Sequence, residues 1–184
     1  EIVQKYPDYY YLRIYLGQYQ NLIAKNPKKS QISWEEALRI DPNNSLAKLL
    51  LSQLHYVTTT DFQLLSRDEI DMEKAINLIQ EVEIAEPNNY ICPRLLGNVY
   101  RRRGDFDESI KAYEKAMELI GDEKSNSYGQ LLLVNAHNYV FKKEYVTARE
   151  LYAKSIETLR DNGSQNIFTS CLLYTSPSPR DRVL

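Results

Sequence analysis

The stretch from Tyr90 to Glu123, YICPRLLGNVYRRRGDFDESIKAYEKAMELIGDE, decides the fold of this chain. Apolar residues recur at helical spacing on both sides of Gly104, which predicts two amphipathic helices joined by a short turn. The basic triplet at 101–103 suits the end of the first helix, and Gly104 suits the left-handed residue just beyond it. The stretch therefore predicts a helical hairpin.

Small and large side chains alternate on the facing sides of these two expected helices. Gly97, Ser109 and Ala116 are small enough to let two helix backbones approach closely. Tyr100 and Tyr113 are large enough to fill the space that remains. Ser109, Tyr113 and Ala116 also fall at i, i+4 and i+7, which is one face of a helix. The pattern predicts a hairpin held together by small residues packed against large ones.

This combination resembles the tetratricopeptide repeat, a helix–turn–helix unit of about 34 residues with the consensus W-x2-L-G-x2-Y, then A-x3-F, then P. The residues that carry the resemblance are Leu96, Gly97 and Tyr100, followed by Ser109, Tyr113 and Ala116. The chain departs from the consensus at Pro93, which stands in place of Trp, and at Gly121, which stands in place of the closing Pro.

The pattern recurs along the chain, and the resemblance covers about residues 1–165. It implies an all-α fold, a right-handed α-solenoid of stacked antiparallel helix pairs. We expect a partial repeat at 1–9, repeats at about 10–44, 45–89, 90–123 and 129–162, and the start of another at 167–170. Within them we expect first helices at 10–23, 45–57 and 131–142, a turn at 24–29 and a polar link at 122–128. Small and large positions recur as Gly17 with Trp34 and as Ala136 with Tyr152.

Two nearly identical segments, Asp41-Pro-Asn-Asn44 and Glu86-Pro-Asn-Asn89, separate neighbouring repeats. Pro cannot continue a helix, and Asn44 and Asn89 can each cap the helix that follows. Because the two segments are 45 residues apart, the repeat between them is about 11 residues longer than the family norm.

The extra residues of this long repeat lie at about 58–70. Ser66 and Glu69 have the spacing of a capping box, which predicts that the second helix starts near Arg67 and overhangs its partner. The insertion is either a tolerated variation in length or a docking surface formed by Phe62 and Leu64.

The segment at 171–184 differs abruptly in composition from the rest of the chain. Residues 171–181, CLLYTSPSPRD, resemble a translated transposase-type sequencing adapter. We interpret 171–184 as an artefactual tail rather than a natural Ser-Pro-rich one, and the remainder as a fragment cut at both ends.

Composition and charge argue against several other classes of function. The net charge of −2 gives no reason to expect nonspecific nucleic-acid binding. No apolar run reaches the roughly 18 residues that mark a candidate membrane span. Two Cys in 184 residues do not form a disulfide framework.

The sequence has no recognisable pattern of catalytic, cofactor-binding or metal-binding residues. It lacks a Gly-rich phosphate loop and the His and Cys spacing of a zinc site. His55 falls at a core Tyr position of the repeat, so we expect it to be buried with its hydrogen bonds satisfied. His137 falls on the groove side and is expected to be solvent-exposed, and Cys92 is expected to be a small buried residue. We therefore expect no enzyme activity, no cofactor and no metal.

The resemblance implies a non-catalytic scaffold for protein–protein interactions, in which stacked repeats leave a concave groove for partner segments. Fold does not determine function, so two alternatives stay open. The chain could be a docking or regulatory domain of a larger, truncated enzyme, or a structural spacer whose groove has no ligand.

By analogy with the family, positions 2, 5, 9, 12 and 13 of each first helix face the groove. Arg94 and Arg101 lie about two helical turns apart with Asn98 between them, and Arg pairs bind carboxylates well. We expect an extended or helical partner with apolar anchors and an acidic residue opposite this repeat; the alternative is that these Arg are merely solvated. Ile14 falls at a groove position too. The candidate partner-binding residues are Tyr11, Gln18, Leu49, Gln53, Tyr56, Arg94, Asn98, Arg101, Leu133 and His137.

One variant of the family, the carboxylate clamp, grips the C-terminal carboxylates of chaperone tails with Lys and Asn at positions 2 and 6 of its first helices. Those positions here hold Tyr11 and Tyr15, Leu46 and Leu50, Ile91 and Leu95, and Gln130 and Val134. We therefore expect no binding of such tails.

If residues 171–184 derive from an adapter, nothing in the fold was selected to hold them. Truncation after Ser170 is then expected to leave the melting temperature unchanged, as followed by circular dichroism at 222 nm. A substantial drop in the melting temperature of the truncated chain would contradict this interpretation.

Overall fold

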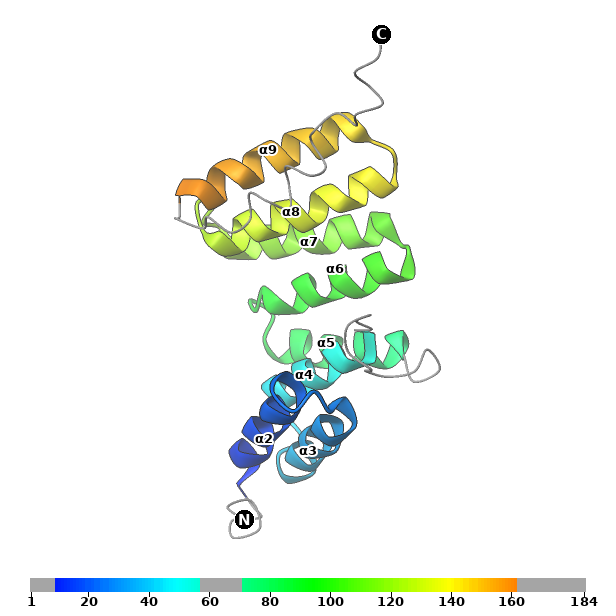
Figure 1. Ribbon diagram of the computed structural model, residues 1–184, viewed down its shortest axis with the longest axis vertical. Coiled ribbons are helices and arrows are strands. Elements are labelled where there is room, and N and C mark those ends of the chain that lie inside the picture. Colours follow the sequence, from blue (N-terminus) through cyan, green and yellow to red (C-terminus); the bar gives the residue numbers. More distant parts are fainter. Residues whose placement is uncertain (1–8, 57–70, 162–184) are drawn as a thin grey trace. The chain divides into compact units, whose positions relative to one another are not determined.

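The computed structural model describes residues 9–56 and 71–161 of the 184-residue chain. Within those residues it contains eight α-helices and no strand, which confirms the predicted all-α class (Figure 1). The helices are α2 Tyr10–Leu22, α3 Pro27–Ile40, α4 Ser45–Tyr56, α5 Met72–Ala85, α6 Ile91–Arg103, α7 Phe106–Ile120, α8 Asn126–Phe141 and α9 Tyr145–Asp161.

The chain divides into two compact units, which are described separately: the first ends at Arg103 and the second begins at Gly104. In the first unit, each helix packs against the next one along the chain, from α2 to α6, and α4 also contacts α6. In the second unit, α7 packs on α8 and α8 packs on α9. Neighbours in sequence are therefore neighbours in space, as expected for a helical repeat.

The first hairpin, α2 with α3, is built around Trp34 and Gly17. Trp34 is almost completely buried, and its indole Nε1 donates a hydrogen bond of 3.2 Å to the carbonyl oxygen of Ile14. A Cβ atom added to Gly17 would lie only 2.2 Å from that Nε1 atom. The indole therefore occupies the place where a side chain at position 17 would be, which is the predicted packing of a large residue against a small one.

In the second unit a large side chain again packs against a glycine, at a position that was not predicted from the sequence. A Cβ atom on Gly129 of α8 would lie 2.8 Å from Cγ of Leu159 on α9. Beside this contact, the buried hydroxyl of Ser155 donates a hydrogen bond of 2.7 Å to the Gly129 carbonyl oxygen. Close approach and a buried hydrogen bond together fix α8 against α9.

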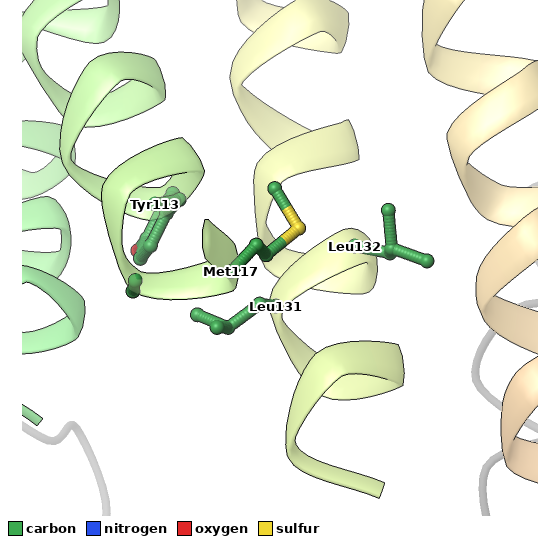
Figure 2. Packing of buried hydrophobic residues seen from close by; sticks show 5 residues of the cluster. Tyr113, Met117, Leu131 and Leu132 are labelled. Carbon is green, nitrogen blue, oxygen red and sulfur yellow. The ribbon is translucent and has the colours of Figure 1, made fainter. Parts of the chain in front are cut away.

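The core of the second unit begins between α7 and α8. Figure 2 shows the side chains of Met117 and Leu131 lying between these two helices, with the ring of Tyr113 nearby. Tyr113 and Ala116 are completely buried. The small and large residues predicted to face inward from this helix are therefore core residues.

The two Asn caps predicted between repeats are present. Oδ1 of Asn44 accepts a hydrogen bond of 3.0 Å from the backbone N–H of Ala47 at the start of α4. Oδ1 of Asn89 accepts one of 3.1 Å from the N–H of Ile91 at the start of α6. Each Asn satisfies a donor that the first helical turn would otherwise leave unpaired.

The predicted start of the long repeat's second helix near Arg67 is wrong, because α5 begins at Met72. Asp71 has a non-helical backbone, with φ −125° and ψ 87°, and its carboxylate accepts a hydrogen bond from the N–H of Lys74. The backbone N–H of Asp71 also donates to the carbonyl oxygen of His55, which returns the chain to the end of α4. Ser66, and the docking surface suggested for Phe62 and Leu64, lie outside the described residues.

Two other helices, by contrast, begin earlier than predicted, because residues nearer the N-terminus cap them. The expected turn at 24–29 ends sooner, because Asn26 is the N-cap of α3 and its side chain accepts a hydrogen bond from the backbone N–H of Lys29. The helix begins at Pro27, and Pro is favoured at the first position of a helix. The expected polar link at 122–128 is shorter too, since Ser125 accepts a hydrogen bond from the N–H of Tyr128 and α8 begins at Asn126.

Replacement of Trp34 by Ala removes the largest fully buried side chain of the first hairpin. We expect the free energy of unfolding to fall by about 3–5 kcal/mol, because a cavity is left where the indole lay. Urea denaturation followed by circular dichroism measures this loss, and a loss below about 1 kcal/mol would contradict the packing described here.

Candidate partner-binding site

The ten residues predicted to bind a partner all lie on first helices of the expected repeats. They are Tyr11 and Gln18 on α2, Leu49, Gln53 and Tyr56 on α4, Arg94, Asn98 and Arg101 on α6, and Leu133 and His137 on α8. The first three helices belong to one compact unit and α8 belongs to the other, so the two groups are described separately.

In the first unit, the predicted residues of α4 and α6 meet. These two helices contact each other although α5 lies between them in sequence. Nδ2 of Asn98 donates a hydrogen bond to the hydroxyl oxygen of Tyr56 over 3.4 Å. The bond is long, but it joins two candidate residues that are 42 positions apart.

Exposure differs strongly among the candidate residues. The Tyr11 side chain is well exposed, whereas Leu49 and Tyr56 each expose only 7% of their surface and can offer a partner no more than an edge. Gln53 and Asn98 are half-buried. Ile14, which was also expected in the groove, is 2% exposed and belongs to the core.

Arg94 and Arg101 combine partial burial with the absence of a charged partner in the described chain. Both side chains are half-buried, and the Nε atom of each is buried without a hydrogen-bond partner. Among the described residues neither guanidinium forms an ion pair, whereas Arg103, two positions further on, lies 2.7 Å from the carboxylate of Glu73. The pair therefore presents positive charge that the described chain does not neutralise.

A row of Tyr side chains on α2 was missed by the sequence analysis. Tyr11, Tyr15 and Tyr19 follow one another at every fourth position and expose 56%, 66% and 57% of their surfaces. The periodicity that could have revealed this row is plain in the sequence.

The later first helices bury, wholly or in part, the residues that correspond to Tyr15 and Tyr19. Tyr15 and Tyr19 lie two residues before and two residues after Gly17, the small residue of α2. On later first helices, residues at these positions pack against the preceding helix. Leu54 of α4 clusters with Trp34 of α3, and Asn138 of α8 donates a hydrogen bond of 2.9 Å to Ser109 of α7. The corresponding pairs are Leu50 and Leu54, Leu95 and Val99, and Val134 and Asn138.

A second cluster of aromatic residues lies at one end of the second unit. The rings of Phe106 and Phe141 are stacked, with their centroids 5.1 Å apart and their planes 6° from parallel. An open pocket of about 390 Å³ beside them is lined by residues 104–108 and Lys142. Lys142 lies 2.7 Å from Asp107 and 3.0 Å from Glu144, and its contact with Asp107 lowers the pKa of that carboxyl group. These charges are already paired.

The two His residues differ from their expected environments. His137 is half-buried rather than exposed, and its ring meets the edge of Tyr152 with the centroids 5.6 Å apart. His55 is buried as predicted, but within the described chain neither of its ring nitrogens has a hydrogen-bond partner, so the expectation of a satisfied His was wrong. Burial lowers the pKa of His55, and nearby Lys74 lowers it further. Cys92 is fully buried, as predicted.

Neither a metal site nor a membrane span is evident in the parts of the chain that the structure describes. Over residues 9–56 and 71–161, no three His, Cys, Asp or Glu side chains cluster in a way that could hold a metal ion. None of the helices described is both long and apolar enough to cross a bilayer.

These contacts define a class of protein: an all-α helical repeat whose hairpins pack through small and large residues. Residues 90–161 match the family model described as "Tetratricopeptide repeat". The resemblance stated from the sequence is thereby confirmed over these residues. No curated protein sequence matches the chain.

Solved structures of tetratricopeptide proteins share the fold over most of the chain. One is TTC0263, a thermophilic tetratricopeptide protein of Thermus thermophilus, with a TM-score of 0.70 and 18% identity over 93% of this chain and 85% of that one. Another is MamA, residues 41 to the end, from Desulfovibrio magneticus RS-1, with a TM-score of 0.64 and 19% identity over 89% and 81%. At such low identity the likeness concerns the fold alone.

The buried His55 predicts a specific dependence of stability on pH. Its pKa in the folded state lies below the usual value, so the unfolded chain binds the proton first as the pH falls below about 6.5, and folding is then disfavoured. Asp71 and Glu35 oppose this shift only in part. We expect the free energy of unfolding to fall between pH 7 and pH 5, and to fall less in a His55→Phe variant. Urea titrations at both pH values measure the difference; an equal loss in both proteins would contradict the prediction.

Proposed function

We propose that this chain is a non-catalytic scaffold that binds an extended or helical segment of a partner protein along the exposed sides of its first helices. The observation that supports this proposal most directly is the contact of α4 with α6, which brings candidate residues of two successive first helices together. This part of the chain contains an aromatic edge from Tyr56, an amide from Asn98 and two Arg side chains that form no ion pair with the residues that the structure describes.

The way the hairpins pack supports this proposal. Gly17 and Trp34 use the facing sides of α2 and α3 for close packing. Outside these contacts, α2 keeps Tyr11 exposed, and α6 keeps Arg94 and Arg101 half-buried. First helices therefore retain side chains that are available to a partner after the core has formed.

The proposal of a non-catalytic role rests on the environment of the potentially reactive side chains. Cys92 is fully buried on α6, and His55 is buried on α4. His137 lies in the other unit and contacts an aromatic ring. Burial keeps the Cys92 thiol and the His55 imidazole away from a substrate in solution.

The division into repeats at about 10–44, 45–89, 90–123 and 129–162 remains part of this proposal. It is supported by the paired caps at Asn44 and Asn89 and by the family match at 90–161. In this division, Leu133 and His137 are the predicted groove residues of the last repeat and lie on α8 of the second unit.

The proposal is tested with peptides selected against the whole chain from a random library displayed on phage. For a selected peptide, Tyr11→Ala is expected to raise the dissociation constant about tenfold, because aromatic anchors commonly contribute more than 1 kcal/mol to binding. The matched control is Ile84→Ala on the second helix α5, where the side chain is 84% exposed. This control is expected to change the constant less than twofold.

Isothermal titration calorimetry gives both constants, and circular dichroism verifies that each variant is folded. If Ile84→Ala weakens binding and Tyr11→Ala does not, the partner binds the second helices and the groove assignment is wrong.

A further inference from the structure

We propose that Arg94, Asn98 and Arg101 form a binding site for a carboxylate side chain, Asp or Glu, of a bound partner peptide. This inference rests on the proposed function, because it specifies the chemistry of the segment that the groove holds. It adds one claim, that a negatively charged group is required at α6.

The three residues lie on one side of α6. Asn98 follows Arg94 by four positions and precedes Arg101 by three, which is the spacing of residues on a common helix face. The two Arg backbones are therefore about 10 Å apart along the helix axis. Asn98 lies one turn from each of them, so a ligand opposite Asn98 is within the span of both guanidinium groups.

Arg94 and Arg101 differ from the other described Arg residues because each combines a buried, unpartnered Nε atom with the absence of a carboxylate partner, whereas Arg13, whose Nε is also buried, lies 3.9 Å from Glu36. The Nε–H groups of Arg94 and Arg101 are removed from solvent and have no acceptor in the described chain. A buried donor without an acceptor is unfavourable by about 1–3 kcal/mol, and more for a charged group. Arg102 and Arg149 also lack a carboxylate partner there, but both are exposed and water can satisfy them. A carboxylate from outside would supply the missing acceptors at 94 and 101.

The surroundings of the site favour a peptide over a nucleic acid. The adjoining helix α4 contributes the edges of Leu49 and Tyr56 and the amide of Gln53 rather than further cations. Its Lys48 is already paired with Glu81 at 2.7 Å. Nucleic-acid sites need a continuous basic surface, whereas an apolar edge, an amide and a pair of Arg match a peptide with one acidic side chain.

The hydrogen bond from Asn98 to Tyr56 restrains the side chain of the middle residue of the three. Nδ2 of Asn98 is directed at the Tyr56 hydroxyl, which is itself nearly buried. This contact directs the amide toward α4. The arrangement reduces the conformational entropy that is lost when a ligand binds.

The test uses peptides selected on phage against the whole chain. The double variant Arg94→Glu/Arg101→Glu is compared with the control Arg102→Glu/Arg149→Glu, which changes the net charge equally at two exposed Arg residues. At constant ionic strength, we expect the first variant to bind a selected peptide at least tenfold more weakly and the control to bind it within about twofold of the parent. A third variant, Arg94→Gln/Arg101→Gln, removes the charge without reversing it and is expected to lose affinity too. Circular dichroism and melting temperatures verify that each variant is folded.

A thermodynamic cycle then identifies the group that the site binds. Replacing the acidic residue of the peptide by Ala is expected to weaken binding to the parent tenfold but to leave binding to the Gln variant almost unchanged. Equal losses in both proteins, an equal loss in the exposed control, or selected peptides without an acidic residue would overturn the carboxylate site.

The outcomes also separate this inference from the proposed function. If Tyr11→Ala weakens peptide binding while the Arg variants do not, the groove is correct and the carboxylate site is wrong. If neither change affects binding, both are wrong. If a single-stranded oligonucleotide binds the parent and loses affinity in the Gln variant while peptides do not, the site takes phosphate and the inference is overturned.

Discussion

The insertion of Trp34 into the space left by Gly17 is the contact that holds α2 against α3. The indole lies where a Cβ atom would be, and its N–H group is satisfied by a backbone carbonyl of the neighbouring helix. The contact fixes both the distance between α2 and α3 and their rotation about their own axes. Leu159 against Gly129 has the same effect in the second unit.

The rotation of each first helix decides which of its side chains remain available for binding. Once one side of a helix is committed to its hairpin partner, the residues on other sides are assigned to the core or to the surface. On α6 this assignment buries Cys92 and Val99 and leaves Arg94 and Arg101 at the boundary with solvent. The candidate binding surface is therefore a consequence of core packing, and it requires no special loop or strained backbone.

Much of the fold could be predicted from the sequence because its signals are local and repeated. The small and large positions recur in each repeat, and the segments around Asn44 and Asn89 are nearly identical. Helix starts were predicted less well where several capping residues compete. Ser66 and Asp71 both have a suitable sequence context, and only the structure identifies Asp71 as the cap of α5.

The candidate site could be predicted only in outline. Spacing along a helix placed Arg94, Asn98 and Arg101 on one face, but it could not reveal whether other charges neutralise the two Arg side chains. That depends on contacts between residues far apart in sequence, such as the pairing of Arg103 with Glu73 or of Tyr56 with Asn98. The same limitation explains why His55 was expected to have hydrogen-bond partners and has none among the described residues.

A double-mutant cycle at positions 17 and 34 measures whether the Trp34 indole fills the space beside Gly17. Replacing Gly by Ala within a helix normally stabilises it by about 1 kcal/mol. If the indole fills the space at Gly17, Gly17→Ala destabilises the parent protein by about 1–3 kcal/mol, because the new methyl group forces the packing apart. In a Trp34→Ala background the same substitution is predicted to be neutral or stabilising. An equal effect of Gly17→Ala in both backgrounds, measured by urea denaturation, would show that the two residues do not interact and would contradict the account.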